Sequence, residues 1–113
     1  MKSKLDFVTN SSSTSYLIHN VSYSDNLTAK SFVESIWPHI QDEMAMYGFN
    51  YTKKQLIESL EKDYDQFPLP PQEKMIATWG DNDGTIAGDV FDYVLRGNIS
   101  TGLVEIFLHG YNR

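Results

Sequence analysis

The sequence predicts an α+β fold in which three helices pack mainly on one face of a small sheet of three to four strands. Apolar residues recur every three to four positions in three segments, while other segments alternate apolar and polar positions as strands do. The length of 113 residues and the hydrophobic content of 41% are those of one folded domain. We therefore expect a single domain over residues 1–113, with residues 1–15 as a flexible or hairpin arm.

The first predicted strands flank a run of hydroxyl side chains. Residues 5–8 and 15–23 are rich in branched and aromatic side chains, which is typical of strands, and the polar run NSSSTS lies at residues 10–15. A cluster of small polar residues between apolar segments favours a turn. We expect two strands, or a strand and an extended arm, joined by this run.

Helical spacing follows in residues 28–47. Its apolar positions include Phe32, Ile36 and Ile40, and either Thr28 or Asn26 is suited to cap the start. Pro38 lies inside this pattern and lacks the amide that would bond back to residue 34. We therefore expect a kink or a break near residues 35–37.

A capping box starts the second helix. In Thr52-Lys53-Lys54-Gln55 the threonine hydroxyl and the glutamine amide are placed to bind unpaired backbone amides of the first turn. A helix over about residues 53–64 follows, with its apolar stripe inward. The predicted outer face carries Glu58, Glu61, Lys62 and Asp65, and FPLPPQ then forms a stiff extended linker.

The last part of the chain predicts a strand, a helix and a strand. Residues 74–79 have the composition of a buried strand, residues 85–96 have helical spacing, and residues 103–109 alternate between two faces. Together they predict a right-handed β-α-β crossover, in a sheet of a size that is often mixed.

Charge and residue content limit the function classes. A net charge of −6 disfavours direct binding to nucleic acid, because phosphate affinity comes from clustered Lys and Arg. An acidic surface fits a protein partner with a basic surface, or serves solubility alone. Cysteine is absent and no apolar run has the length of a signal peptide or a membrane span, so we expect a soluble cytoplasmic protein with no membrane partner. A homodimer is also compatible, because the edges of a small sheet are open.

Acidic residues gather in the turn WGDNDGT at residues 79–85. Asp81, Asp83 and, within the following helix, Asp89 supply oxygen ligands of the kind that hard divalent cations prefer. An EF-hand match fails because Ile86 and Ala87 occupy its middle. Two interpretations stay open: an Asx turn that caps the helix, or a divalent cation site at Asp81, Asp83 and Asp89. No other cofactor is predicted.

Catalytic motifs are missing from the sequence. No nucleophile elbow, no phosphate-binding glycine loop and no metal-binding histidine spacing occurs. His19, His39 and His109 lie in separate predicted elements, and His19 meets His109 only if their strands pair. We assign no catalytic residue and favour a non-catalytic protein, while enzyme activity stays open.

The hydroxyl run carries one resemblance. The stretch LDFVTNSSSTSYLI resembles the N-terminal signature K-x-x-F-V-T-N-S-S-S-S-S-F/Y of small uncharacterised proteins of bacteria, archaea and their phages. Thr14 stands where the signature has a serine. The resemblance implies a prokaryotic or phage source and no particular activity.

Three roles are open for the hydroxyl run. Its side chains and backbone amides suit recognition by a partner as an added strand, suit modification by phosphate, or form a loop without a ligand. The candidate residues for recognition are Asn10, Ser11, Ser12, Ser13 and Ser15.

Two functions fit these observations. The first is a non-catalytic protein-binding accessory factor of phage or mobile-element type, for example an acidic inhibitor of a host nucleic-acid-targeting enzyme such as a CRISPR or restriction nuclease. Its partner-binding residues would be Glu58, Glu61 and Asp65, together with the hydroxyl run. The alternative is a metal-dependent enzyme or cation-binding module that uses the Asp81, Asp83 and Asp89 turn.

Overall fold

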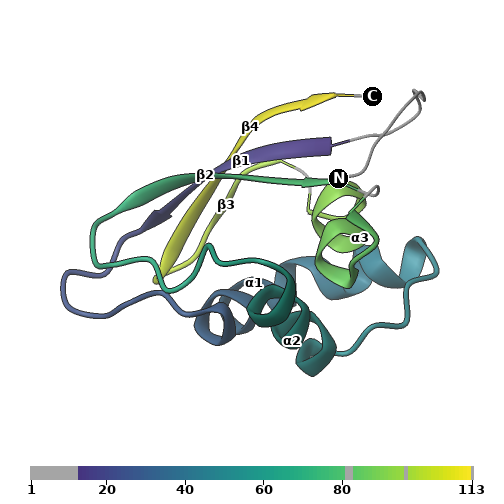
Figure 1. The fold of residues 1–113 in the computed structure, drawn as a ribbon, viewed down its shortest axis with the longest axis horizontal. Helices are drawn as coiled ribbons and strands as arrows, with labels where there is room; N and C mark the ends of the chain where they lie inside the picture. The colour runs from purple at the N-terminus through teal and green to yellow at the C-terminus, as the bar shows by residue number, and fades with distance from the viewer. Residues whose placement is uncertain (1–12, 81–82, 96, 113) are drawn as a thin grey trace.

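The described part of the chain forms three helices and a four-stranded sheet, the α+β fold that the sequence predicts (Figure 1). The computed structural model describes residues 13–80, 83–95 and 97–112. The elements are β1 (Ser13–Asn20), α1 (Ala29–Met46), α2 (Lys53–Asp63), β2 (Lys74–Gly80), α3 (Ile86–Tyr93), β3 (Ile99–Ser100) and β4 (Val104–Asn112).

β1 lies inside the sheet, between β2 and β4, although it is the first strand along the chain. The strand order is β2-β1-β4-β3, and every neighbouring pair is antiparallel. β2 and β4, which α3 connects, therefore run parallel to each other as in a β-α-β unit, but β1 lies between them. The short strand β3 pairs with the start of β4, and the sequence analysis does not predict it.

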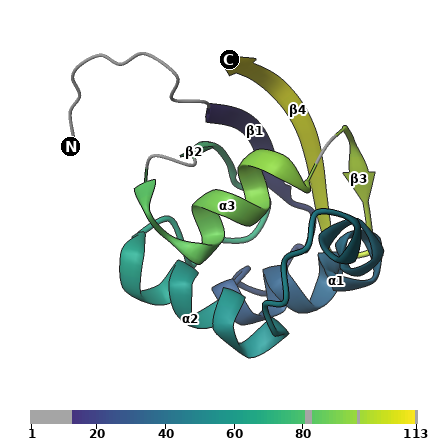
Figure 2. The same cartoon turned by 90° about the vertical axis from the view of Figure 1, so that its right-hand side faces the viewer.

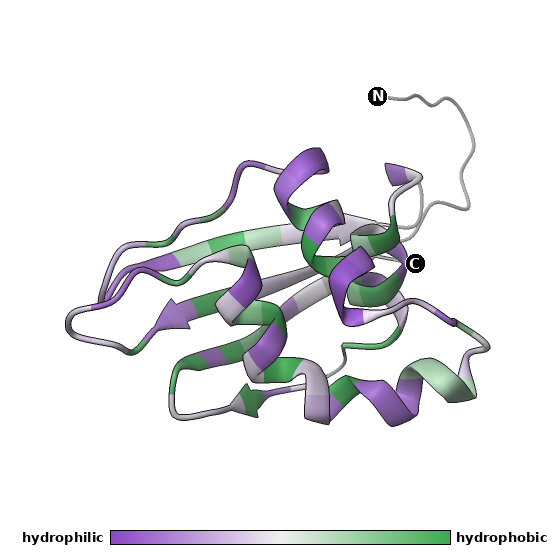
Figure 3. Ribbon diagram, turned by 90° about the horizontal axis from the view of Figure 1, so that it is seen from below, coloured by the Kyte–Doolittle hydropathy of each residue, from purple (hydrophilic) through white to green (hydrophobic). Residues whose placement is uncertain are grey.

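The two faces of the sheet have different surroundings. Tyr16 and Ile18 of β1 are fully buried, whereas Leu17 and His19 point to the opposite face and are half-buried. All three helices lie on the buried side (Figures 1 and 2). Hydrophobic and hydrophilic residues alternate along each helix, as expected for helices with one buried face (Figure 3).

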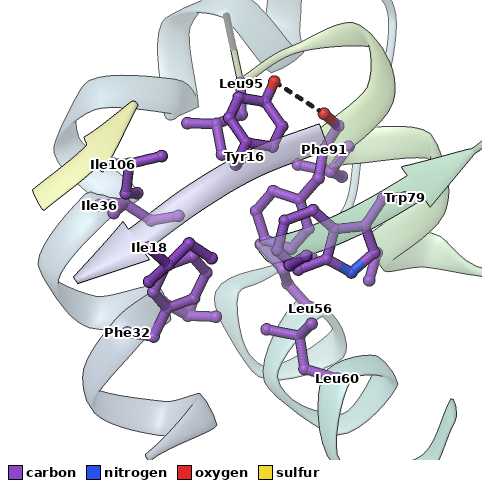
Figure 4. Close-up of a cluster of buried hydrophobic side chains, with 14 of the residues drawn as sticks. Tyr16, Ile18, Phe32, Ile36, Leu56, Leu60, Trp79, Phe91, Leu95 and Ile106 are labelled. Atoms are coloured by element: carbon purple, nitrogen blue, oxygen red, sulfur yellow. Dashed lines mark hydrogen bonds between the residues drawn. The ribbon is translucent and has the colours of Figure 1, made fainter. Parts of the chain in front are cut away.

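An aromatic cluster fills the core between the sheet and the helices (Figure 4). The ring centroids of Trp79 and Phe91 lie 4.6 Å apart, and those of Phe32 and Phe91 lie 5.8 Å apart. Leu56 and Leu60 of α2 are buried in the same cluster. These side chains come from β2, α1, α2 and α3, so the cluster joins the four elements. Burying each side chain of this size stabilises the fold by about 1.5–3 kcal/mol.

α1 runs without a break through the residues where Pro38 predicts a kink or a break. Pro38 is exposed, and so is Glu34, whose carbonyl oxygen loses its helical amide, so water can solvate this group. Ile36 and Ile40 hold the helix against the core on both sides of the proline. Tertiary packing of this kind overrides a local helix breaker.

The predicted caps of α1 and α2 are both confirmed, and at the start of α1 the Thr28 hydroxyl accepts the Ser31 amide. The capping box at Thr52 is confirmed, because its hydroxyl accepts the Gln55 amide and the Gln55 side chain accepts the Thr52 amide. α3 is shorter than predicted and ends at Tyr93. The Leu95 amide donates to the Val90 carbonyl five residues back, which closes the last turn.

Gly88 allows α3 to pack directly on the end of β2. A Cβ atom at this position would overlap the carbonyl oxygen of Gly80 and crowd the hydroxyl of Thr85. The overlapping atom is a backbone carbonyl oxygen at the buried end of β2, so it cannot move away as a flexible side chain could. The close approach of helix and strand therefore requires glycine at position 88.

Replacing Gly88 by alanine is expected to lower the free energy of unfolding by about 1–3 kcal/mol, because the added methyl group forces α3 away from β2. Chemical denaturation followed by tryptophan fluorescence measures the change. The matched control is Gly102→Ala, where a Cβ meets open space. The control should shift the free energy of unfolding by no more than about 0.5 kcal/mol. Equal effects of the two substitutions would contradict this packing.

Candidate functional site

The candidate site is a groove between α2 and the start of α3, with a volume of about 420 Å³. From α2 it is lined by Glu58, Ser59, Lys62 and Asp63, and Thr85 closes it from the other side. Glu58 and Asp63 are exposed. The groove therefore presents two carboxylates and one ammonium group to solvent.

Ser59 fixes the floor of this groove. Its hydroxyl accepts the backbone amide of Ala87, in the first turn of α3, at 3.0 Å, and donates to the Asp63 carboxylate at 3.1 Å. The side of the amphipathic helix α2 that carries Leu56 and Leu60 is buried, and this places Ser59 against α3. One buried serine thus connects the two helices and orients an acidic side chain.

Two tyrosines tie the ends of α2 to acidic residues beside or within α3. The Tyr64 hydroxyl, just after α2, donates to the Asp83 carboxylate at 2.6 Å, and the Gly80 amide donates to the same oxygen at 3.2 Å. The Tyr51 hydroxyl, just before α2, donates to Asp89 at 3.0 Å. Each pair restrains one end of the helix.

These environments change the acidity of both tyrosines. Burial, and then the hydrogen bond to Asp83, raise the pKa of Tyr64 well above its ordinary value. Burial and the carboxylate of Asp89 likewise raise the pKa of Tyr51. Both hydroxyls therefore remain protonated donors at neutral pH.

The structure gives Asp83 and Asp89 separate hydrogen-bond partners. Each carboxylate accepts a hydrogen bond from a different tyrosine. Within the described ranges, no group of three or more His, Asp or Glu side chains has the geometry to hold a metal ion. Asp81, the third residue of the predicted cation site, lies outside the described residues.

The predicted partner-binding carboxylates are divided between two grooves. Glu58 lines the groove described above, but Glu61 faces a second groove of about 520 Å³ between α1 and α2, which Glu58 also borders. Lys30, Lys53 and Lys54 line this second groove. Asp65 is exposed just beyond α2. The start of α2 is therefore basic, and its C-terminal part is mainly acidic with Lys62 among the carboxylates.

The described part of the hydroxyl run forms a strand and not a loop. Ser13 and Ser15 lie in β1 on the face away from the helices, and Ser15 shares a hydrogen bond of 2.7 Å with Thr78 of β2. Asn10, Ser11 and Ser12 lie outside the described residues. Of the predicted recognition residues, the structure thus places Ser13 and Ser15 on the side opposite the α2 carboxylates.

Thr14, between these serines, points into the core. Its hydroxyl donates to the carboxylate of the fully buried Asp92 in α3 at 2.7 Å. Two residues further, the Tyr16 hydroxyl donates to the Phe91 carbonyl at 3.0 Å (Figure 4). No local pattern in the sequence predicts this role for Thr14, because its partner Asp92 lies 78 positions away. The two-residue period of a strand, which places Thr14 on the same buried face as Tyr16, is the one feature of the sequence that indicates an inward Thr14.

The histidines of the sheet do not pair with each other. His19 lies opposite Glu105 in the register of β1 and β4, with 3.5 Å between its ring nitrogen and the carboxylate. His109 is the extra residue where the register shifts between Ser15 and Tyr16. The two histidines are therefore not cross-strand neighbours.

The comparisons with known proteins give no relative to support a function. No protein-family model matches the chain, and neither the curated proteins nor the solved structures contain a match. In the described ranges, none of the helices combines the length and the apolar character needed to cross a bilayer.

Thr14→Val is expected to lower the free energy of unfolding by about 1.5–3 kcal/mol, because it removes a buried hydrogen bond to a carboxylate while keeping the side-chain shape. Urea denaturation measures the change. Ser15→Ala, one residue along on the opposite face, is the control and should cost about 0.5 kcal/mol or less. A larger loss for Ser15→Ala than for Thr14→Val would contradict the inward role of Thr14.

Tyr64→Phe is expected to flatten the loss of stability at alkaline pH. The folded pKa of Tyr64 lies above its unfolded value near 10.0, so its contribution is present below that pH and decreases as the pH rises through the window up to the raised folded pKa. Denaturation curves from pH 8 to pH 11 measure the slope. Tyr23→Phe, at a side chain 87% exposed, is the control. Parallel curves for wild type and Tyr64→Phe would refute the assignment.

Proposed function

We propose that the protein is a non-catalytic binding factor that presents the C-terminal part of α2 to a protein partner with a basic surface. The observation that carries the proposal is the exposure of four carboxylates along the C-terminal half of α2 and its end, where Lys62 is the one basic side chain among Glu58, Glu61, Asp63 and Asp65. The net charge of −6 has the same sign as this surface. Complementary charge speeds association and selects partners.

Rigidity supports this role for α2. The Tyr51 to Asp89 and Tyr64 to Asp83 hydrogen bonds restrain the helix at both ends, and Ser59 connects its middle to α3. A surface that is ordered before binding loses less conformational entropy when the complex forms. The carboxylates are therefore carried by an element whose position is fixed before the partner arrives.

The partner class that fits best is a nucleic-acid-targeting enzyme of a prokaryotic host. Such enzymes bind phosphate backbones through clustered Lys and Arg, and the carboxylates of the C-terminal part of α2 compete for the same groups. The resemblance of residues 4–16 to small bacterial, archaeal and phage proteins supports a phage or mobile-element origin. In this role the protein acts by covering a basic surface of its partner, without a catalytic step.

The test compares two variants of equal charge change in an affinity pulldown from a prokaryotic lysate. The first reverses Glu58, Glu61 and Asp65 to lysine. The second reverses Asp25, Asp42 and Glu43, which are exposed outside α2. We expect a stoichiometric partner whose recovery falls at least about tenfold in the first variant, persists in the second and weakens in high salt.

Two outcomes would contradict the proposal. Equal recovery of the partner by both variants, or binding that does not depend on salt, would exclude the carboxylates of α2 as the recognition surface. A rise in melting temperature with millimolar Mg²⁺ or Ca²⁺ that Asp83→Asn removes would instead favour the cation-binding alternative at Asp81, Asp83 and Asp89.

A further inference from the structure

The face of the sheet that the helices do not cover has an exposed apolar row. Leu17 of β1 lies directly between Ile76 of β2 and Phe107 of β4 in the strand register. Ile76 is 52% exposed and Phe107 is 40% exposed, while their chain neighbours Ala77 and Ile106 are buried on the helix side. The helices of the described residues all lie on that other side (Figures 1 and 2).

A charged row lies beside the apolar row on the same face. In the register, His19 of β1 pairs with Lys74 of β2 on one side and with Glu105 of β4 on the other. The two outer strands therefore carry opposite charges at equivalent positions. On the far side of the apolar row, Ser15 and Thr78 make the face polar and uncharged.

This arrangement is complementary to itself. A two-fold axis parallel to β1, between two sheets stacked face to face, exchanges the sides on which β2 and β4 lie. Lys74 of one copy then lies opposite Glu105 of the other, and Ile76 lies opposite Phe107. Leu17 lies opposite its own counterpart at the centre. Stacked sheets of this kind lie about 10 Å apart with strands within about 30° of each other, which brings such side chains into contact.

We propose that the open face of the sheet binds a second copy of this chain, with Leu17, Ile76 and Phe107 at the centre of the interface and two Lys74 to Glu105 pairs beside it. The charge pattern favours a second copy over another occupant, because opposite signs on β2 and β4 match only a surface with the same two columns in reverse order. A buried apolar row gives the association energy and the charged row sets the orientation.

The size of the face limits the strength of this dimer. Three strands spaced about 4.8 Å apart and seven residues long at about 3.3 Å each give a face of roughly 350 Å² per copy before side-chain relief is counted. This area is below the ~800 Å² per partner of a standard stable interface. The dimer should therefore dissociate in the micromolar range and be in equilibrium with the monomer.

The dimer leaves the acidic side of α2 free. The helices lie on the face opposite the proposed interface (Figure 1), so both copies present Glu58, Glu61 and Asp65 outward. Two linked acidic helices bind a repeated basic surface with an avidity above that of either one. The dimer proposal itself does not depend on the function of α2, because its residues and its test are separate.

Sedimentation velocity of the full-length protein over a concentration series tests the interface. Wild type should shift from monomer to dimer as concentration rises through the micromolar range. Phe107→Asp should raise the dissociation constant at least about tenfold, since it places a charge in the apolar row. Met46→Asp is the matched control at an apolar side chain 80% exposed on α1, and it should leave the equilibrium unchanged.

A charge exchange identifies the orientation. Lys74→Glu alone and Glu105→Lys alone should each weaken the dimer several-fold through like-charge contacts, and the double variant should return the dissociation constant to within about twofold of wild type. Circular dichroism and melting curves check that each variant is folded. A monomer at every concentration, a dimer that survives Phe107→Asp, or a double variant no tighter than the single ones would each overturn the proposal.

Discussion

Two hydroxyl groups on the buried face of β1 hold the sheet to the helix layer. Thr14 donates to Asp92, and Tyr16 donates to the backbone of Phe91, so consecutive inward positions of the central strand are bonded to consecutive residues of α3. The alternation of β1 makes this possible, since the same period turns Ser13, Ser15 and Leu17 to the open face. A shift of one residue in register would reverse both sets, so these two bonds also specify the register.

Hydrogen bonds attach α2 to α3 and to the residues that lead into α3. Tyr51, Ser59 and Tyr64 bond to α3 or to the residues that lead into it, at the start, middle and end of α2 respectively. The acidic residues of this region therefore have two different roles. Asp83 and Asp89 accept structural hydrogen bonds, whereas Glu58 and Asp65 project into solvent. Of these neighbouring acidic residues, Glu58 and Asp65 are therefore the ones free to bind a partner.

Local signals in the sequence predict most of the elements and few of the contacts between them. The capping box at Thr52, the helical periods and the alternation of β1 depend on neighbouring residues, and the structure confirms them. The order of the strands, the short β3 and the Thr14 to Asp92 bond depend on residues far apart, which no local pattern encodes. At Pro38 the local signal predicts a break that does not occur, because the packing of Ile36 and Ile40 maintains the helix. The placement of Glu58 and Glu61 on the outer side of α2 follows from helical spacing. The presence of Lys30 beside Glu61 does not, because Lys30 belongs to α1 and is brought there by the fold.

The place of β1 in the sheet sets the order in which the nascent chain folds. β1 is synthesised before the other strands, yet its two neighbours are β2 and β4, and β4 is the last strand made. β1 is therefore without one of its two partners until residues 104–112 have been synthesised. The helices form from local contacts and are ready earlier, whereas pairings that span most of the chain are slow. The sheet is thus completed only when β4 joins β1.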